Sequence, residues 1–149
     1  TLLTVASYGA EKTIFSPNGL EGFGDDGIGV HIQPLAPKDR RDKSEIKAFL
    51  DQIELQLLKA GLKVKEGSDE YIMVNVFPVV VEGKTVYLGG LLYARRPIEF
   101  TTSGGKKYNG IGTVLVFGGG EYDAARAAIN GLVDGFIKHR LKANPKKKE

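Results

Sequence analysis

The sequence contains no cysteine and only two histidines, His31 and His139, among its 149 residues. The lack of cysteine excludes disulfides, thiolate metal sites and a cysteine nucleophile, and it fits every redox compartment. Neither histidine has the spacing of a zinc site or lies beside a nucleophile motif. We therefore expect no catalytic residue, no metal site and no cofactor, and a protein that is not an enzyme.

The sequence also lacks a long hydrophobic run and a strong excess of charge. The apolar run at residues 2–6 (LLTVA) is too short to span a bilayer, so no transmembrane segment is predicted. Residues 1–10 fit either the end of a signal sequence, for which Tyr8 is a poor cleavage-site residue, or an N-terminal strand. The net charge of +3, from 21 basic and 18 acidic residues, favours solubility and is smaller than the positive charge of a dedicated nucleic-acid binder.

What the sequence does contain is a clear amphipathic helix within residues 42–64. Its apolar residues recur at helical spacing and form one stripe: Ile46, Phe49, Leu50, Ile53 and Leu57. Leu55 and Leu58 fall beside that stripe and widen it, which is typical of a helix that lies across a sheet. Gly61 can take the left-handed conformation that ends the helix.

A glycine-rich stretch and a strand precede this helix. Residues 11–27 contain four glycines, which predict a long loop, and residues 28–35 alternate apolar and polar side chains as a strand does. The spacing of Gly22, Gly24 and Gly27 matches the dinucleotide-binding fingerprint, but that motif requires a helix where this sequence continues as a strand. Asp25 and Asp26 would also repel a phosphate, so we interpret the stretch as a glycine turn.

The middle of the chain has the composition of β-structure. Further strands are predicted at residues 71–81, 85–95, 97–102 and 111–117, of which the first two form an antiparallel hairpin. Pro78 removes a donor from the ladder and predicts an edge, a bulge or a kink. Gly89 and Gly90 predict a second irregularity near it.

A second amphipathic helix follows the last strand after Gly118, Gly119 and Gly120. It is predicted to begin near Glu121, and its apolar stripe consists of Tyr122, Ala125, Ile129, Leu132, Val133 and Phe136. A glycine turn before a helix is a candidate anion site. The Lys-Ser/Thr of the nucleotide-binding loop is missing and Glu121 occupies the mouth, so the alternative is a tight turn packed under the sheet.

The C-terminus carries the main electrostatic feature of the chain. From Lys138 onward there are six basic residues and a single acidic one, and the candidate partner contacts are Lys138, Arg140, Lys142, Lys146, Lys147 and Lys148. Such a patch can meet an acidic protein surface or lipid phosphates, or it can be a solvated terminus. No aromatic residues are interleaved with it, which disfavours single-stranded nucleic acid.

These elements predict a single α+β domain at residues 28–145. It is preceded by a strand or glycine-rich segment at 1–27 and followed by the basic tail at 146–149. The predicted order is β-α-β-β-β-β-α, which gives a two-layer sandwich: a mainly antiparallel sheet of four or five strands with two helices on one face.

Four segments of the sequence resemble a family of small, uncharacterised exported bacterial proteins: GIGVHIQPL, LDQIELQLLKAGLKV, YIMVNVF and ARAAINGLVDGFIKHRLKANP. The domain is also similar in outline to the N-terminal domain of TolB and to periplasmic activator lipoproteins. The resemblance covers about residues 28–145 and implies a noncatalytic accessory protein of the cell envelope, periplasmic or extracellular, with a protein partner. The lipid-bearing cysteine of the lipoprotein members is absent from this sequence.

Two functions remain open at this point, and an enzyme is a third alternative that would need a pocket holding at least two titratable groups with perturbed pKa values, which the sequence does not locate. The first is an exported accessory or structural subunit that docks onto a larger assembly through a sheet edge, the glycine loop or the basic tail. The second is a binding module for a small or anionic ligand at the turn formed by Gly118, Gly119 and Gly120. An exposed strand edge near Pro78 would favour the first function, because such edges recruit partner strands.

Overall fold

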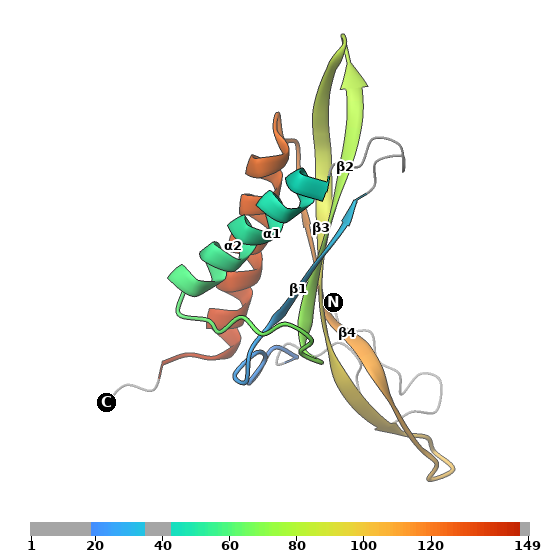
Figure 1. Ribbon diagram of the computed structural model, residues 1–149. Coiled ribbons are helices and arrows are strands. Elements are labelled where there is room, and N and C mark those ends of the chain that lie inside the picture. The colour runs from blue at the N-terminus through green and yellow to red at the C-terminus, as the bar shows by residue number, and fades with distance from the viewer. Residues whose placement is uncertain (1–18, 35–42, 147–149) are drawn as a thin grey trace.

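The computed structural model describes residues 19–34 and 43–146 (Figure 1). The described part contains the following elements: β1 (Gly29–Pro34), α1 (Lys43–Lys59), β2 (Tyr71–Val81), β3 (Lys84–Thr101), β4 (Lys107–Gly119) and α2 (Ala125–Ala143). The predicted N-terminal strand or signal remnant at residues 1–10 lies outside the described residues, as do Lys147 and Lys148. Among the described helices, none is long and apolar enough to cross a membrane.

The predicted α+β fold is confirmed, with a four-stranded sheet in the order β1-β2-β3-β4 and both helices on one face of it (Figure 1). The sheet is mixed, because β1 runs parallel to β2 while β2–β3 and β3–β4 are antiparallel. The parallel pair follows from α1, which carries the chain back to the edge where β1 began. The structure therefore has a crossover unit followed by a meander.

One predicted boundary is wrong, because residues 85–95 and 97–102 belong to one long strand, β3. The element order is accordingly β-α-β-β-β-α, with one strand fewer than predicted. From the sequence, Pro97 is predicted to start a separate strand. The neighbouring strand β2 begins opposite Arg95, so Pro97 lies beyond its end and is paired only with Ile111 of β4. At such an edge position a missing N–H is tolerated and the strand continues.

The predicted irregularity around Pro78 is confirmed. The register of β2 against β3 shifts between Val76, which faces Gly90, and Pro78, which faces Tyr87. A Cβ atom on Gly90 would lie 2.5 Å from the carbonyl oxygen of Asn75 and 2.7 Å from Cδ1 of Leu132. The backbone of β3 is thus pressed between β2 and α2 at this point, and only glycine fits.

The core lies between the sheet and the two helices. Ile53 and Leu57 of α1 are fully buried, as the helical stripe predicts. Leu55 and Leu58, which were expected to widen that stripe, are instead 53% and 56% exposed. They face away from the core because α1 packs on β1 and α2 along one narrow face. The buried residues of α2 are five of the six predicted, Ala125, Ile129, Leu132, Val133 and Phe136, with Ala128 in addition. The sixth, Tyr122, precedes the helix.

Helix α2 begins at Ala125, four residues later than predicted. The cause is a backbone bridge in which Tyr122 donates to and accepts from Tyr87 of β3, at 2.8 and 3.0 Å. The side chain of Tyr122 then turns back onto α2, where a Cβ on Gly131 would lie 2.9 Å from its hydroxyl oxygen. One turn further on, a Cβ on Gly135 would overlap the ring of Phe117. The two glycines therefore form a groove on α2 that receives these two rings.

A polar ladder joins the two helices. The Nε2 of Gln52 donates to Oδ1 of Asn130 at 2.7 Å, and the Nε2 of Gln56 donates to Oδ1 of Asp134 at 2.7 Å. The same two amide groups also donate to the backbone carbonyls of Arg126 and Asn130. From the first pair to the second, the residue number rises by four on both helices, so α1 and α2 run parallel.

Candidate functional site

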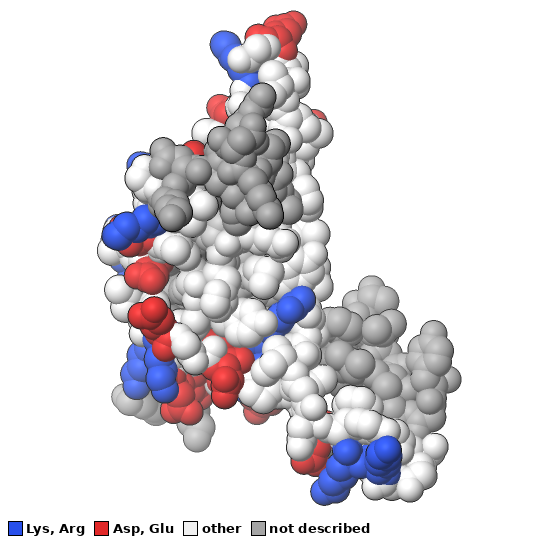
Figure 2. All heavy atoms as spheres, turned by 45° about the vertical axis from the view of Figure 1, so that its right-hand side comes forward, with Lys and Arg blue, Asp and Glu red and all other residues white. Residues whose placement is uncertain are grey.

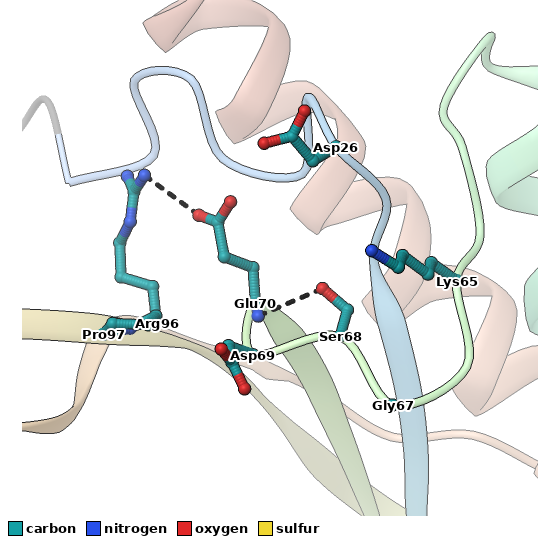
Figure 3. Close-up of a pocket in the computed structure, with 8 residues that line it drawn as sticks. All are labelled: Asp26, Lys65, Gly67, Ser68, Asp69, Glu70, Arg96 and Pro97. Carbon is teal, nitrogen blue, oxygen red and sulfur yellow. Dashed lines mark hydrogen bonds and ion pairs between the residues drawn. The ribbon is translucent and has the colours of Figure 1, made fainter.

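A polar cleft lies between the glycine loop, residues 19–27, and the start of β2 (Figure 3). Its volume is about 430 Å³, and it is lined by Asp26, Lys65, Gly67, Ser68, Asp69, Glu70, Arg96 and Pro97. Three chain segments form it: the glycine loop, the connection from α1 to β2, and β3. The sequence analysis did not predict this cleft, because its residues come from segments that only the fold brings together.

Two charged residues of the cleft hold the glycine loop in place. Nη2 of Arg96 lies 2.9 Å from Oε2 of Glu70, and its Nη1 donates to the carbonyls of Gly19 and Glu21, each at 2.9 Å. The guanidinium also lies over the ring of Phe23, 5.7 Å from its centroid. The charge of Arg96 is thus paired with Glu70 and its Nη1 donates to the loop, so Arg96 is a structural residue and not an open anion-binding group.

The remaining side chains of the cleft do not form a catalytic set. The hydroxyl of Ser68 donates to the carbonyl of Gly27 at 2.8 Å and accepts from the backbone N–H of Glu70 at 3.2 Å, so it closes the turn before β2. Lys65, Asp26 and Asp69 are exposed. Within residues 19–34 and 43–146 there is no group of three His, Asp or Glu side chains placed to hold a metal ion. The polar groups of the cleft hold the glycine loop in place.

Two further clusters fasten the glycine loop to the C-terminal helix. The Nε of Arg140 donates to the carbonyl of Phe23 at 2.7 Å, and its Nη2 pairs with Asp25 at 2.9 Å. The side-chain amide of Asn144 accepts from the N–H of Gly22 at 2.7 Å and donates to the carbonyl of Leu20 at 2.8 Å. The loop is thus closed at both ends by side chains from distant parts of the sequence.

The predicted basic surface at the C-terminus is divided by this arrangement. Lys138, Lys142 and Lys146 are exposed, whereas the side chain of Arg140 is only 12% exposed and is bound to the loop. Lys147 and Lys148 lie outside the described residues. The three exposed lysines remain candidate partner contacts, and Arg140 has a structural role that the charge pattern did not reveal.

The predicted anion site is placed as follows. Gly118 and Gly119 are the last residues of β4, paired with Leu91 and Gly90, and Gly120 follows them. The turn does not lead directly into the helix, because the bridge to Tyr87 intervenes and α2 starts with no side-chain cap. The site stays a prediction, and the exposed carboxylates of Glu121 and Asp123 weigh against an anion there.

A hollow of about 550 Å³ lies beside this turn and is lined by Val86, Tyr87, Leu88, Glu121, Tyr122 and Asp123. Burial, together with the negative charge of Glu45, raises the pKa of Tyr87 above its usual value. The chemistry of the hollow suits a polar or cationic group better than an anion.

The hairpin formed by residues 77–88, which we call the β2–β3 arm, exposes several large apolar side chains. It extends beyond the ends of both helices (Figure 1), because β1 pairs with β2 only up to Val76 and β4 pairs with β3 only from Gly90. Its exposed side chains are Phe77 (42%), Val80 (65%), Val81 (51%) and Leu88 (55%). A sequence signal existed, since β2 is an eleven-residue apolar strand beside a six-residue neighbour.

The sides of the β2–β3 arm carry little charge. Figure 2 shows charged side chains at the tips of the two hairpins and also along the left and lower left of the view, with a largely uncharged surface between the two tips. The β2–β3 arm carries only Glu82 and Lys84, which flank the turn and have opposite signs. The arm is therefore electrically neutral and apolar along its length, as protein contact surfaces commonly are at their centre.

No protein-family model matches the chain, and no curated protein matches it. Solved structures that are similar to it in outline include those of two bacterial lipoproteins. A minor lipoprotein from Acinetobacter baumannii is 14% identical, with 77% of this chain and 91% of that chain covered at a TM-score of 0.25. Rare lipoprotein B from Shewanella oneidensis is 8% identical, with 77% of this chain and 86% of that chain covered at a TM-score of 0.25. The chain thus has a weak fold-level likeness to bacterial lipoproteins, and a likeness of this size carries no argument about function.

Proposed function

We propose that the chain is a noncatalytic, exported accessory subunit that docks onto a larger protein assembly of the bacterial cell envelope, and that the β2–β3 arm is its docking surface. The observation that carries the proposal is the exposure of four large apolar side chains, Phe77, Val80, Val81 and Leu88, on one projecting ribbon. The compartment rests on the sequence resemblance to exported envelope proteins.

The arm is poorly suited to remain in water. A two-stranded ribbon is marginally stable by itself, and contiguous exposed apolar side chains mark contact surfaces. Burying one such side chain completely is worth roughly 1.5–3 kcal/mol. Val80 points to the opposite face of the ribbon from its neighbour Val81. A partner that encloses both faces of the arm therefore gains the contribution of all four half-buried side chains, roughly 3–6 kcal/mol. This gain is enough to anchor a docked subunit when the rim adds further contacts.

The test is gentle isolation of the protein from its source, followed by light scattering and identification of stoichiometric partners. Val80→Asp with Val81→Asp should abolish co-purification of the partner, because two carboxylates would be buried without counter-charges. Leu58→Asp is the matched control, since Leu58 is equally exposed at 56% but lies on α1. Loss of the partner with the control alone would refute the assignment of the arm, and the absence of any partner would refute the subunit proposal.

The ligand-binding alternative is separated by a different measurement. A ligand of the turn at Gly118–Gly120 would raise the melting temperature of the purified chain in proportion to its occupancy. An accessory subunit requires no such rise with inorganic phosphate or with small anionic metabolites. A reproducible rise that Gly120→Asp abolishes would favour the ligand-binding module over the subunit.

A further inference from the structure

The outer edge of β4 is the longest strand edge that the described part of the chain leaves open. Among the described residues β4 pairs only with β3, over the thirteen residues Lys107–Gly119. This strand contains no proline, and Lys107 is its only charged residue. Proteins usually blunt such an edge with charges or prolines along its length, because open edges pair with other strands.

Two apolar side chains on this edge lie on the same face of the sheet. Ile111 pairs with Pro97, and Val116 pairs with Tyr93, which is four residues away on β3 and thus on the same face. An irregularity opposite Ala94 and Arg95 makes this possible, because it shifts the alternation of β4 by one residue. Ile111 is 51% exposed and Val116 is 48% exposed.

The two ends of the edge carry opposite charges. Lys106 and Lys107 are exposed at its beginning, and Glu121 and Asp123 are exposed just beyond its end. An edge that is positive at one end and negative at the other is complementary to a copy of itself running in the opposite direction. This complementarity selects a second copy of the chain over partners of uniform charge, such as a nucleic acid or an anionic membrane.

We propose that two copies of the chain pair through antiparallel β4 strands, about a two-fold axis between Thr113 and Val114. In this register Ile111 faces Val116 of the second copy, and Lys106 faces Glu121 of the second copy. Each of these contacts occurs twice, and the two sheets join into one continuous sheet of eight strands. The inference concerns the purified chain alone and does not depend on the envelope partner proposed above.

The register makes a charge exchange the decisive test. Sedimentation and light scattering of the purified full chain, from about 1 to about 500 µM, should show a mass rising from 16.1 kDa toward twice that value. Glu121→Lys should weaken the dimer several-fold to tenfold, because it sets two lysines opposite each other at both ends. Lys106→Glu combined with Glu121→Lys should restore the wild-type dissociation constant.

Substitution at the centre of the edge is the second test. Val116→Lys and Ile111→Lys should each abolish the dimer, since each places two lysines between the paired strands. Neither substitution should change the melting temperature of the chain much, because both side chains are exposed. Leu58→Lys, on the remote face of α1, should leave the dimer intact. A monomer at every concentration overturns the proposal. So does a dimer that both edge variants retain, and a charge exchange without rescue overturns the register.

Discussion

Replacement of Gly90 by alanine tests the packing of the sheet against α2 most directly. The new methyl group would lie 2.5 Å from the carbonyl oxygen of Asn75 and 2.7 Å from Cδ1 of Leu132. The leucine can rotate away, but the carbonyl oxygen belongs to the backbone of β2, so β2 and β3 must separate locally. Overpacking of this kind typically costs about 1–3 kcal/mol, and alanine offsets part of it, about 0.5–1 kcal/mol, by reducing the freedom of the unfolded chain.

The expected net effect of Gly90→Ala is a loss of about 2 kcal/mol in the free energy of unfolding, near the upper end of the difference between the overpacking cost and the offset from alanine. For a chain of 149 residues this corresponds to a melting temperature lower by about 4–8 °C. Circular dichroism during thermal and urea unfolding measures both quantities. Gly110→Ala is the matched control, because Gly110 is also in the sheet and a methyl group there meets nothing within 4 Å. Equal stability of the two variants would refute the reasoning.

Three further outcomes are expected. Asn144→Ala should lower the free energy of unfolding by about 1–3 kcal/mol and speed hydrogen exchange at the Gly22 amide, because that partly buried donor loses its acceptor. Substitution of the exposed residue Lys142 by alanine should do neither. Gln56→Glu should destabilise at pH 7 by bringing a second carboxylate to Asp134 and recover near pH 4, as urea titration at both pH values would show. Because the pKa of Tyr87 is raised above 10.0 in the folded state, its contribution to stability is intact below pH 10 and is lost as pH rises through the folded value. Tyr87→Phe should remove that alkaline loss, and a wild-type-like pH profile in this variant would contradict it.

The helices and the fold class were predictable because they depend on local periodicity. Ile53 and Leu57 are buried where the helical spacing places them, and Pro78 marks the irregularity that its missing N–H requires. The start of α2 was not predictable, because Tyr122 is held by a strand that precedes it by thirty-five residues. Arg140 was assigned to a charged surface for the same reason: its acceptor, the carbonyl of Phe23, is 117 residues away in the sequence.

The projecting arm could have been found by comparing strand lengths. A strand of eleven residues beside one of six must continue past its neighbour, and the residues from Phe77 onward are the ones that do so. The polar cleft at Glu70 and Arg96 had no comparable signal, because each of its residue types is common in loops. The open edge of β4, with its opposite charges at the two ends, could not be predicted, because the composition does not specify which strand lies at the edge of the sheet.

The fastening of the glycine loop also has a consequence for synthesis of the chain. The loop is held by Arg140 and Asn144, which are made 115 to 124 positions after their partners. A nascent chain can form α1 and the strands while the loop is still unfastened. Completion of the fold must therefore wait until Asn144 has left the ribosome, and a chain that ends before Arg140 would emerge with this closure missing.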